Sequence, residues 1–227
     1  MKTIAVISRK GGAGKTTVAV NLALVAHLCG LKVLLVDIDP QRSASLTLGS
    51  RSATGPRVEV KSSGHLYQTA LIAQRDGCDL MIVDTPPAPL SEVAQAVNVA
   101  DLNLIVSRPT FLDIASVVQS VDLIRQLGRT GAVVLNQTPC PRGDLAVPSV
   151  RRAAEALALT GLPLLASLGA RVVYQTSLAR GLSALEQGSQ AATDELTALW
   201  TAVQLRLDSV DREKAANDRA PPRLRAI

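Results

Sequence analysis

The sequence predicts an α/β fold in which a doubly wound, mostly parallel sheet is flanked by helices. Short runs rich in β-branched residues alternate with longer stretches of helical periodicity, as in a chain of strand–helix–strand units. Apolar residues make up 47% of the chain, but there are only one Phe, one Trp and two Tyr, so Ala, Val, Leu and Ile must build the core. That mixture is typical of buried parallel strands covered by Ala-rich helices.

The elements follow one another in a regular order. The β-branched apolar runs are predicted as buried strands over residues 3–8, 32–36, 79–83, 102–106 and 132–135, and 162–168 is a candidate for a sixth. Helices, several opened by Pro or by a capping Ser, Thr or Asp, are predicted over about 15–29, 65–76, 90–99, 111–127, 146–160, 172–180 and 188–208. Residues 50–64 are polar and turn-rich, which predicts a loop with one short edge strand. Right-handed crossovers between parallel strands place a ligand at the carboxyl ends of the strands.

One domain is expected over residues 1–208, followed by a charged, flexible tail over 209–227. The tail contains Pro221-Pro222 and ends in a basic stretch with Arg219, Arg223 and Arg225. The three cysteines of the chain are far apart and form no C-x-x-C pair, which argues against a disulfide framework or a zinc site and fits a reducing cytoplasm. No secretion signal or transmembrane segment is recognisable. The net charge of +5 permits a polyanionic partner.

A phosphate-binding loop is predicted between the first strand and the first helix. Residues 9–17 read Arg-Lys-Gly-Gly-Ala-Gly-Lys-Thr-Thr. Glycines allow backbone N–H groups to point at phosphate oxygens, Lys15 can reach the β- and γ-phosphates, and the Thr16 hydroxyl can ligate Mg²⁺. The predicted nucleotide-binding residues here are Gly11, Gly12, Ala13, Gly14, Lys15, Thr16 and Thr17.

This loop departs from the pattern G-x-x-x-x-G-K-[ST], because Arg9 replaces the first glycine and a second lysine, Lys10, precedes a Gly-Gly pair. In this respect it resembles the deviant Walker A motif of the ParA/MinD family of ATPases, which are P-loop NTPases. Residues 36–41, Val-Asp-Ile-Asp-Pro-Gln, are similar to the family's second acidic motif, and residues 82–87, Ile-Val-Asp-Thr-Pro-Pro, to its Walker B motif. The resemblance spans residues 1 to about 207 and implies an ATPase that uses ATP and Mg²⁺.

The chemistry assigns roles to the basic and acidic residues of these motifs. Hydrolysis of a γ-phosphate requires charge neutralisation and a group that orients the attacking water. Lys15 and Mg²⁺ serve the first need, and the resemblance implies that Asp39 serves the second. Asp84 is expected to hold Mg²⁺ through a water and Asp37 to support the magnesium shell, with capping of a strand or helix as the alternative for each aspartate. The resemblance also implies that Lys10 reaches the nucleotide of a partner subunit, so that ATP joins a homodimer.

Asn136 directly follows the strand predicted over 132–135, at the position where the family's asparagine contacts adenine. An amide side chain can donate and accept at the adenine edge at once. The alternative is a turn residue before Pro139 and Pro141.

Within the family, the chain is most similar to short ParA-type partition ATPases that lack an N-terminal DNA-reading domain. Residues 169–186 look like the late motif of that branch, and its members bind duplex DNA without sequence preference as ATP dimers. Between residues 142 and 180 five arginines stand against two acids, which would serve phosphate contacts or form a solvated helix face. The DNA-binding candidates are Arg171, Arg151, Arg152 and Arg180, with the tail arginines next.

The resemblance therefore implies a cytoplasmic, nucleoid-associated switch for plasmid or chromosome partition. It would dimerise on Mg-ATP, bind non-specific double-stranded DNA, and be released when a ParB-like or cargo-bound adaptor stimulates hydrolysis. One alternative is the same switch positioning a protein cargo, such as a microcompartment or a chemoreceptor cluster. A less favoured alternative is a MinD-like ATPase that associates with membranes.

Overall fold

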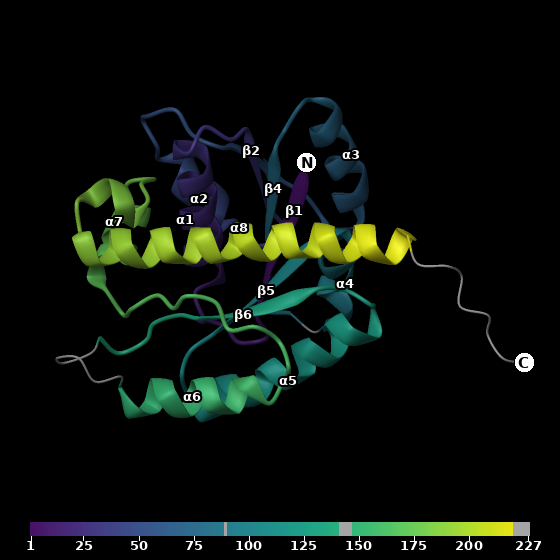
Figure 1. The fold of residues 1–227 in the computed structure, drawn as a ribbon. Helices are drawn as coiled ribbons and strands as arrows, with labels where there is room; N and C mark the ends of the chain where they lie inside the picture. Colours follow the sequence, from purple (N-terminus) through teal and green to yellow (C-terminus); the bar gives the residue numbers. More distant parts are fainter. Residues whose placement is uncertain (89, 141–146, 220–227) are drawn as a thin grey trace, which may run out of the picture.

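The computed structural model describes residues 1–88, 90–140 and 147–219 (Figure 1). Of the residues named above, Pro141, Pro221, Pro222, Arg223 and Arg225 lie outside this part of the chain, as does Arg142, the first of the five arginines between residues 142 and 180. Within it, no helix has both the length and the apolar character needed to cross a bilayer.

A six-stranded parallel sheet forms the centre of the molecule, which confirms the predicted fold class. Its strands are β1 (Lys2–Ile7), β2 (Val33–Asp37), β3 (Arg57–Val60), β4 (Leu80–Asp84), β5 (Leu102–Ser107) and β6 (Gly131–Leu135). Their order is β3-β2-β4-β1-β5-β6, and every neighbouring pair is parallel. The carboxyl ends of β1, β2, β4, β5 and β6 therefore meet at one edge of the sheet, where side chains from distant parts of the sequence come together.

Helices cover both faces of the sheet (Figure 1). They are α1 (Lys15–Leu28), α2 (Ser43–Gly49), α3 (Leu66–Arg75), α4 (Leu90–Val99), α5 (Phe111–Gln126), α6 (Pro148–Ala158), α7 (Val172–Leu178) and α8 (Gln190–Arg219), with short 3₁₀ turns η1 (Ser63–His65) and η2 (Ala184–Gln187). Alternate residues of β1 belong to two separate hydrophobic clusters, as the pleat of a strand requires. One cluster joins the sheet to α1, α7 and α8, and the other joins it to α3, α4, α5 and α6.

Two predictions about strands have different outcomes. The short edge strand expected within 50–64 is β3, which pairs with β2 at the edge of the sheet. The prediction of a strand over 162–168 was wrong, since that segment forms one isolated bridge to β6, at Val133–Leu164, and a second bridge, Thr138–Gly169, lies just beyond it. Pro163 lies in this segment and lacks the N–H that a continuous ladder needs.

Two helices also differ from the prediction. Helix α2 was not predicted, because its seven residues are too few to show a helical period. Helix α8 continues to Arg219, beyond the predicted end at residue 208. Its apolar stripe explains the extension, since Leu207 and Val210 are buried in line with Trp200 and Val203.

Candidate functional site

The loop between β1 and α1 has the geometry of an anion-binding site. Gly12 and Gly14 have φ angles of 72° and 92°, a backbone conformation that glycine adopts without strain. Gly14 is the N-cap of α1, where no side chain caps the helix and no acidic residue lies in the first turn. The first N–H groups of α1 are therefore available to a bound anion, and the partial positive charge of the helix N-terminus favours one.

Side chains from the carboxyl end of β6 hold this loop in place. The Nδ2 of Asn136 donates to the carbonyl of Ala13 at 2.9 Å, and the Nε2 of Gln137 donates to the carbonyl of Gly12 at 2.8 Å. The approach is so close that a Cβ atom built on Gly14 would lie 1.9 Å from Nδ2 of Asn136. Asn136, predicted as a contact to adenine, thus has a further role in this structure as a support of the phosphate loop.

Asp84, at the carboxyl end of β4, forms the acidic centre of the site. The Thr16 hydroxyl donates to Oδ2 of Asp84 at 2.7 Å, whereas Oδ1 is buried without a hydrogen-bond partner among the described residues. Burial raises the pKa of Asp84 to about 7, against the opposing effect of the Thr16 hydrogen bond. Burial likewise lowers the pKa of Lys15, although Asp84 and Asp39 oppose that shift.

The residues around Asp84 fit a magnesium ion. A buried carboxylate oxygen that lacks a partner, next to a threonine hydroxyl, offers the hard oxygen ligands that Mg²⁺ prefers. No group of three or more His, Cys, Asp or Glu side chains within the described residues could hold a metal by itself. Mg²⁺ usually combines one or two protein ligands with phosphate and water oxygens.

Asp37 and Asp39 lie after β2 and differ in their contacts. Asp37 is fully buried, and its two carboxylate oxygens accept the backbone N–H groups of Asp39 at 3.1 Å and Ser45 at 2.9 Å. It therefore shapes the loop that leads into α2, and a part in the magnesium shell remains a prediction. The carboxylate of Asp39 accepts only the N–H of Gln41, through Oδ1 at 2.9 Å, among the residues that the structure covers. Its Oδ2 is left available to orient a water molecule.

A cavity of about 260 Å³ adjoins the phosphate loop on the side of β6 and α7. It is lined by Thr17, Asn136, Gln137, Gly169, Ala170, Arg171, Val172, Tyr174 and Gln175. Thr17 belongs to the first turn of α1, so a nucleotide whose phosphates lie at the loop can extend its nucleoside into this space.

Glu195 of α8 organises one wall of that cavity, and sequence analysis missed it. Its carboxylate accepts Nε and Nη2 of Arg171 at 2.9 and 2.8 Å, the Tyr174 hydroxyl at 2.8 Å and the Gly169 N–H at 3.0 Å. Hydrogen bonding to Glu195 raises the pKa of Arg171, and burial together with Glu195 raises the pKa of Tyr174. No sequence signal pairs these residues, because their contact depends on how α7 and α8 pack.

The four arginines predicted to bind DNA are in different environments. Arg151 and Arg152 are exposed on α6, and Arg180 is exposed just after α7. Arg171 is engaged by Glu195, and only 26% of its side chain is exposed. Because α6 and α7 cover opposite faces of the sheet, the structure divides these arginines between two faces.

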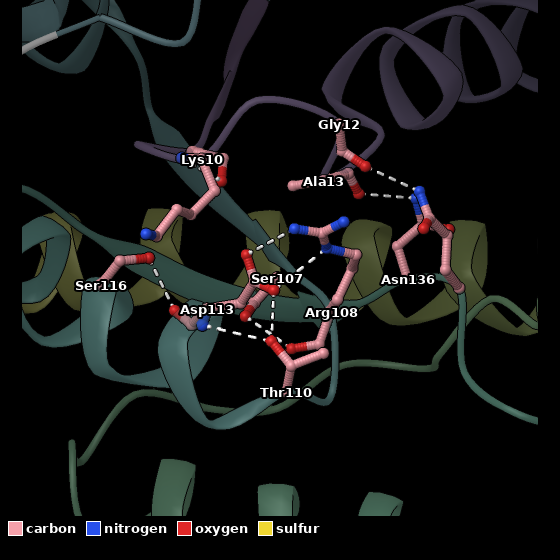
Figure 2. A network of polar contacts seen from close by, with 11 residues as sticks. Lys10, Gly12, Ala13, Ser107, Arg108, Thr110, Asp113, Ser116 and Asn136 are labelled. Atoms are coloured by element: carbon pink, nitrogen blue, oxygen red, sulfur yellow. Dashed lines mark hydrogen bonds and ion pairs between the residues drawn. The ribbon is translucent and has the colours of Figure 1, made fainter.

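The side chain of Lys10 lies on the α5 side of the phosphate loop. Figure 2 shows its side chain extending toward α5, away from Gly12 and Ala13. There it lines a groove of about 280 Å³ together with Arg9, Leu112, Ala115, Ser116 and Gln119. The role of Lys10 at the nucleotide of a partner subunit stays a prediction.

Known proteins resemble this chain in sequence and in fold. The model of the CobQ/CobB/MinD/ParA nucleotide-binding domain matches residues 4–187. "Maintenance of carboxysome distribution protein A" of Halothiobacillus neapolitanus is 31% identical over 214 residues, which are 88% of this chain and 95% of that protein. The chromosome-partitioning ATPase Soj of Thermus thermophilus is 49% identical over 55 residues, which are 24% of this chain and 22% of Soj.

The solved structures of McdA from Cyanothece have the same fold. Apo McdA superposes with a TM-score of 0.75 at 19% sequence identity, over 89% of this chain and 99% of the other. A variant of the protein in complex with ATP gives a TM-score of 0.73, also at 19% identity, over 90% and 96% of the two chains.

Proposed function

This chain belongs to the CobQ/CobB/MinD/ParA nucleotide-binding family, and from that premise we propose that it is a Mg-ATP-dependent switch that dimerises on ATP and positions a cargo in the cell. The observation that carries the proposal is the meeting of three charged side chains, Lys15, Asp39 and Asp84, at a phosphate loop that also carries Lys10. Asp84 and Asp39 both act to raise the pKa of Lys15, and Lys15 acts to lower the pKa of Asp84, as expected of close neighbours.

Each of these residues has a defined task in the hydrolysis of ATP. The N–H groups of the loop and of α1 bind the phosphates, and Lys15 neutralises negative charge on the β- and γ-phosphates. Asp39 orients the water that attacks the γ-phosphate. Thr16 and Asp84 would hold Mg²⁺, directly and through a water respectively, and the ion would neutralise charge on the phosphate oxygens. Lys10 would complete the site of the partner subunit, which makes hydrolysis depend on dimerisation.

We rank a protein cargo ahead of a DNA cargo. The carboxysome-distribution relative is similar along nearly its whole length, including the regions outside the nucleotide motifs. Similarity to the chromosome-partitioning ATPase Soj covers about a quarter of this chain, and it therefore supports plasmid or chromosome partition, with a ParB-like adaptor, as the second candidate. Deleting the gene separates the two. Clustered protein bodies with normal inheritance of DNA indicate a protein cargo, and loss of a plasmid or chromosome indicates partition.

Binding of the nucleoid is proposed for both candidates, in a protein that stays in the cytoplasm. Arg151, Arg152 and Arg180 are exposed and can neutralise phosphates of duplex DNA without reading its sequence. Arg171 is a weaker candidate for this role, because a contact to DNA would compete with its hydrogen bonds to Glu195.

The proposal is tested by binding to random-sequence duplex DNA with ATP, with ADP and without nucleotide, over a salt series. We expect binding only with ATP, and affinity that falls steeply as salt rises. The variant Asp39→Ala should stay on DNA with ATP, because it cannot hydrolyse the nucleotide. The double variant Arg151→Ala/Arg152→Ala should bind about tenfold more weakly with a shallower salt dependence.

Arg75→Ala, which removes an exposed arginine of α3 far from these residues in the sequence, is the control and should bind as the wild type does. Binding that ignores the nucleotide, or no binding alongside intact ATP-dependent dimerisation, would refute the DNA-tethered switch. In the second case, sedimentation with anionic liposomes tests the MinD-like alternative.

A further inference from the structure

Arg108, the residue directly after β5, places a guanidinium against the phosphate loop (Figure 2). Its Nε donates to Oδ2 of Asp113 at 3.0 Å, and its Nη2 donates to Oδ1 at 3.2 Å. A Cβ atom built on Gly12 would lie 3.9 Å from the remaining terminal nitrogen, Nη1. This nitrogen donates to no group among the described residues, so the ion pair with Asp113 leaves one donor beside the loop unused.

The position of this guanidinium is fixed by the start of α5. Thr110 caps the helix, since its hydroxyl oxygen accepts the N–H of Asp113 at 3.3 Å, and its hydroxyl also donates to the Asp113 carboxylate. The side chain of Asp113 is only 4% exposed, whereas that of Arg108 is 35% exposed. A buried carboxylate that accepts two hydrogen bonds from one edge of a guanidinium fixes the orientation of the other edge before a ligand binds. This lowers the entropic cost of a further hydrogen bond from that edge.

The surface around Arg108 has the composition of a protein contact. Phe111 and Leu112, on the next turn of chain, are 84% and 66% exposed. Leu112 also lines the groove into which Lys10 extends. Large apolar side chains that are exposed side by side mark a surface that a partner covers. A second copy of this chain fits that surface, because Lys10, which is proposed to act on the nucleotide of another subunit, lies on it.

We propose that each subunit donates Arg108, together with Lys10, to the phosphates of the nucleotide bound by its partner. The inference rests on the proposed ATP-dependent dimer and adds a second cation to it. Nη1 of Arg108 would donate a charge-assisted hydrogen bond to a phosphate oxygen, while Asp113 keeps the other edge of the guanidinium in place. An arginine that acts across a subunit boundary stabilises charge on the phosphates only in the assembled state, and so links hydrolysis to assembly.

The test separates binding of nucleotide by one subunit from assembly of two. Affinity for fluorescent ATP and ADP is measured at protein concentrations where the chain is monomeric, and the dimer dissociation constant with ATP is measured by sedimentation equilibrium. For Arg108→Ala we expect unchanged ATP and ADP affinities in the monomer. The dimer dissociation constant should rise by about 100-fold, because a two-fold symmetric dimer loses a charged hydrogen bond of about tenfold twice. Arg108→Lys should weaken the dimer less than Arg108→Ala does. The control Arg75→Ala should leave the dimer dissociation constant unchanged.

Arg108→Ala leaves the buried Asp113 without its counter-ion, so a second variant guards against simple misfolding. Arg108→Gln/Asp113→Asn removes both charges together and should raise the dimer dissociation constant by a similar factor. A dimer constant within about twofold of wild type in that variant would overturn the proposal, as would a parallel loss of ATP and ADP affinity in the monomer, which indicates a structural role. Loss of ATP affinity alone would place Arg108 on its own nucleotide and also overturn it. A wild-type chain that does not dimerise with ATP would instead refute the proposed function.

Discussion

Gly14 shows how a single residue can be fixed by two independent constraints. Its φ of 92° is costly for any other residue type, and Nδ2 of Asn136 occupies the space where a side chain would begin. The glycine is therefore required both by the turn into α1 and by the support that β6 gives to the loop.

We predict that Gly14→Ala lowers the free energy of unfolding by about 2–4 kcal/mol, because it combines backbone strain with loss of the Asn136 hydrogen bond. Urea denaturation measures the change. Gly11→Ala is the matched control, since a Cβ atom there meets nothing within 4 Å, and it should change stability little. Equal losses in the two variants would show that the approach of Asn136 is not the cause.

The residues that the sequence predicts well are those whose task is encoded by neighbours along the chain. Asp84 ends β4, Asp39 follows β2 by two residues, and Lys15 and Thr16 open α1, as the motifs predicted, while their roles stay predictions. Glu195 could not be predicted, because its partners are 21 to 26 residues away and meet it only when α8 packs beside α7. A motif shows which residues serve one site, but not which side chains hold them there.

At the scale of elements, the sequence predicted strands and helices that carry a repeating apolar pattern. Helix α2 was missed because its seven residues are too few to show a helical period, and tertiary contacts stabilise it. The buried carboxylate of Asp37 accepts the Ser45 N–H in its first turn, and only Ala44 and Leu48 of the helix are buried. The segment over 162–168 has an apolar composition like that of a strand, but isolated bridges replace the ladder. Composition alone does not reveal whether the backbone of such a segment stays in register.

The ion pair between Arg51 and Glu186 connects the segment after α2 to η2. Arg51 follows α2, its side chain is 5% exposed, and its Nη1 and Nη2 donate to the Glu186 carboxylate at 3.0 and 2.9 Å. Glu186 lies in η2, where it also accepts the Ser183 N–H at 2.9 Å. Burial acts to raise the pKa of Glu186, but the hydrogen bonds from Arg51 and Ser183 together outweigh it and hold this pKa below its ordinary value of 4.5.

We predict that Glu186→Gln lowers the free energy of unfolding by about 3 kcal/mol at pH 7, because it leaves a buried guanidinium without its counter-ion. Since folding lowers the pKa of Glu186, the ionised pair contributes stability above pH 4.5, and this contribution is lost as the pH falls through the lower, folded value. In urea denaturation between pH 7 and pH 3, the free energies of unfolding of the wild type and of Glu186→Gln should therefore converge as the pH falls. The exposed Glu155→Gln, paired with Arg151, should cost less than about 0.5 kcal/mol. A difference in free energy of unfolding between the wild type and Glu186→Gln that stays constant with pH would show that the ionised pair is not its cause.

At the scale of the whole molecule, the candidate nucleotide site forms only when the strands of the sheet are assembled. Its residues come from the ends of β1, β2, β4 and β6 and from α7 and α8. The strands contribute to both hydrophobic clusters, and α7 and α8 contribute to one of them. An unfolded chain cannot assemble these groups, so a nucleotide binds the folded state alone and must stabilise it.

We predict that Mg-ATP at about 100 times its dissociation constant raises the melting temperature by about 5–10 °C. Binding at that excess adds about 2.7 kcal/mol, and each kcal/mol raises the melting temperature of a chain of this size by about 2–4 °C. Chelating Mg²⁺ with EDTA should reduce the shift, because the phosphates and Asp84 would then face each other without a cation between them. Lys15→Ala should show almost no shift, since it loses the cation that reaches the β- and γ-phosphates. A shift of equal size in Lys15→Ala would mean that the nucleotide binds elsewhere on the molecule, and an equal shift with EDTA would mean that Asp84 and Thr16 do not serve a magnesium ion.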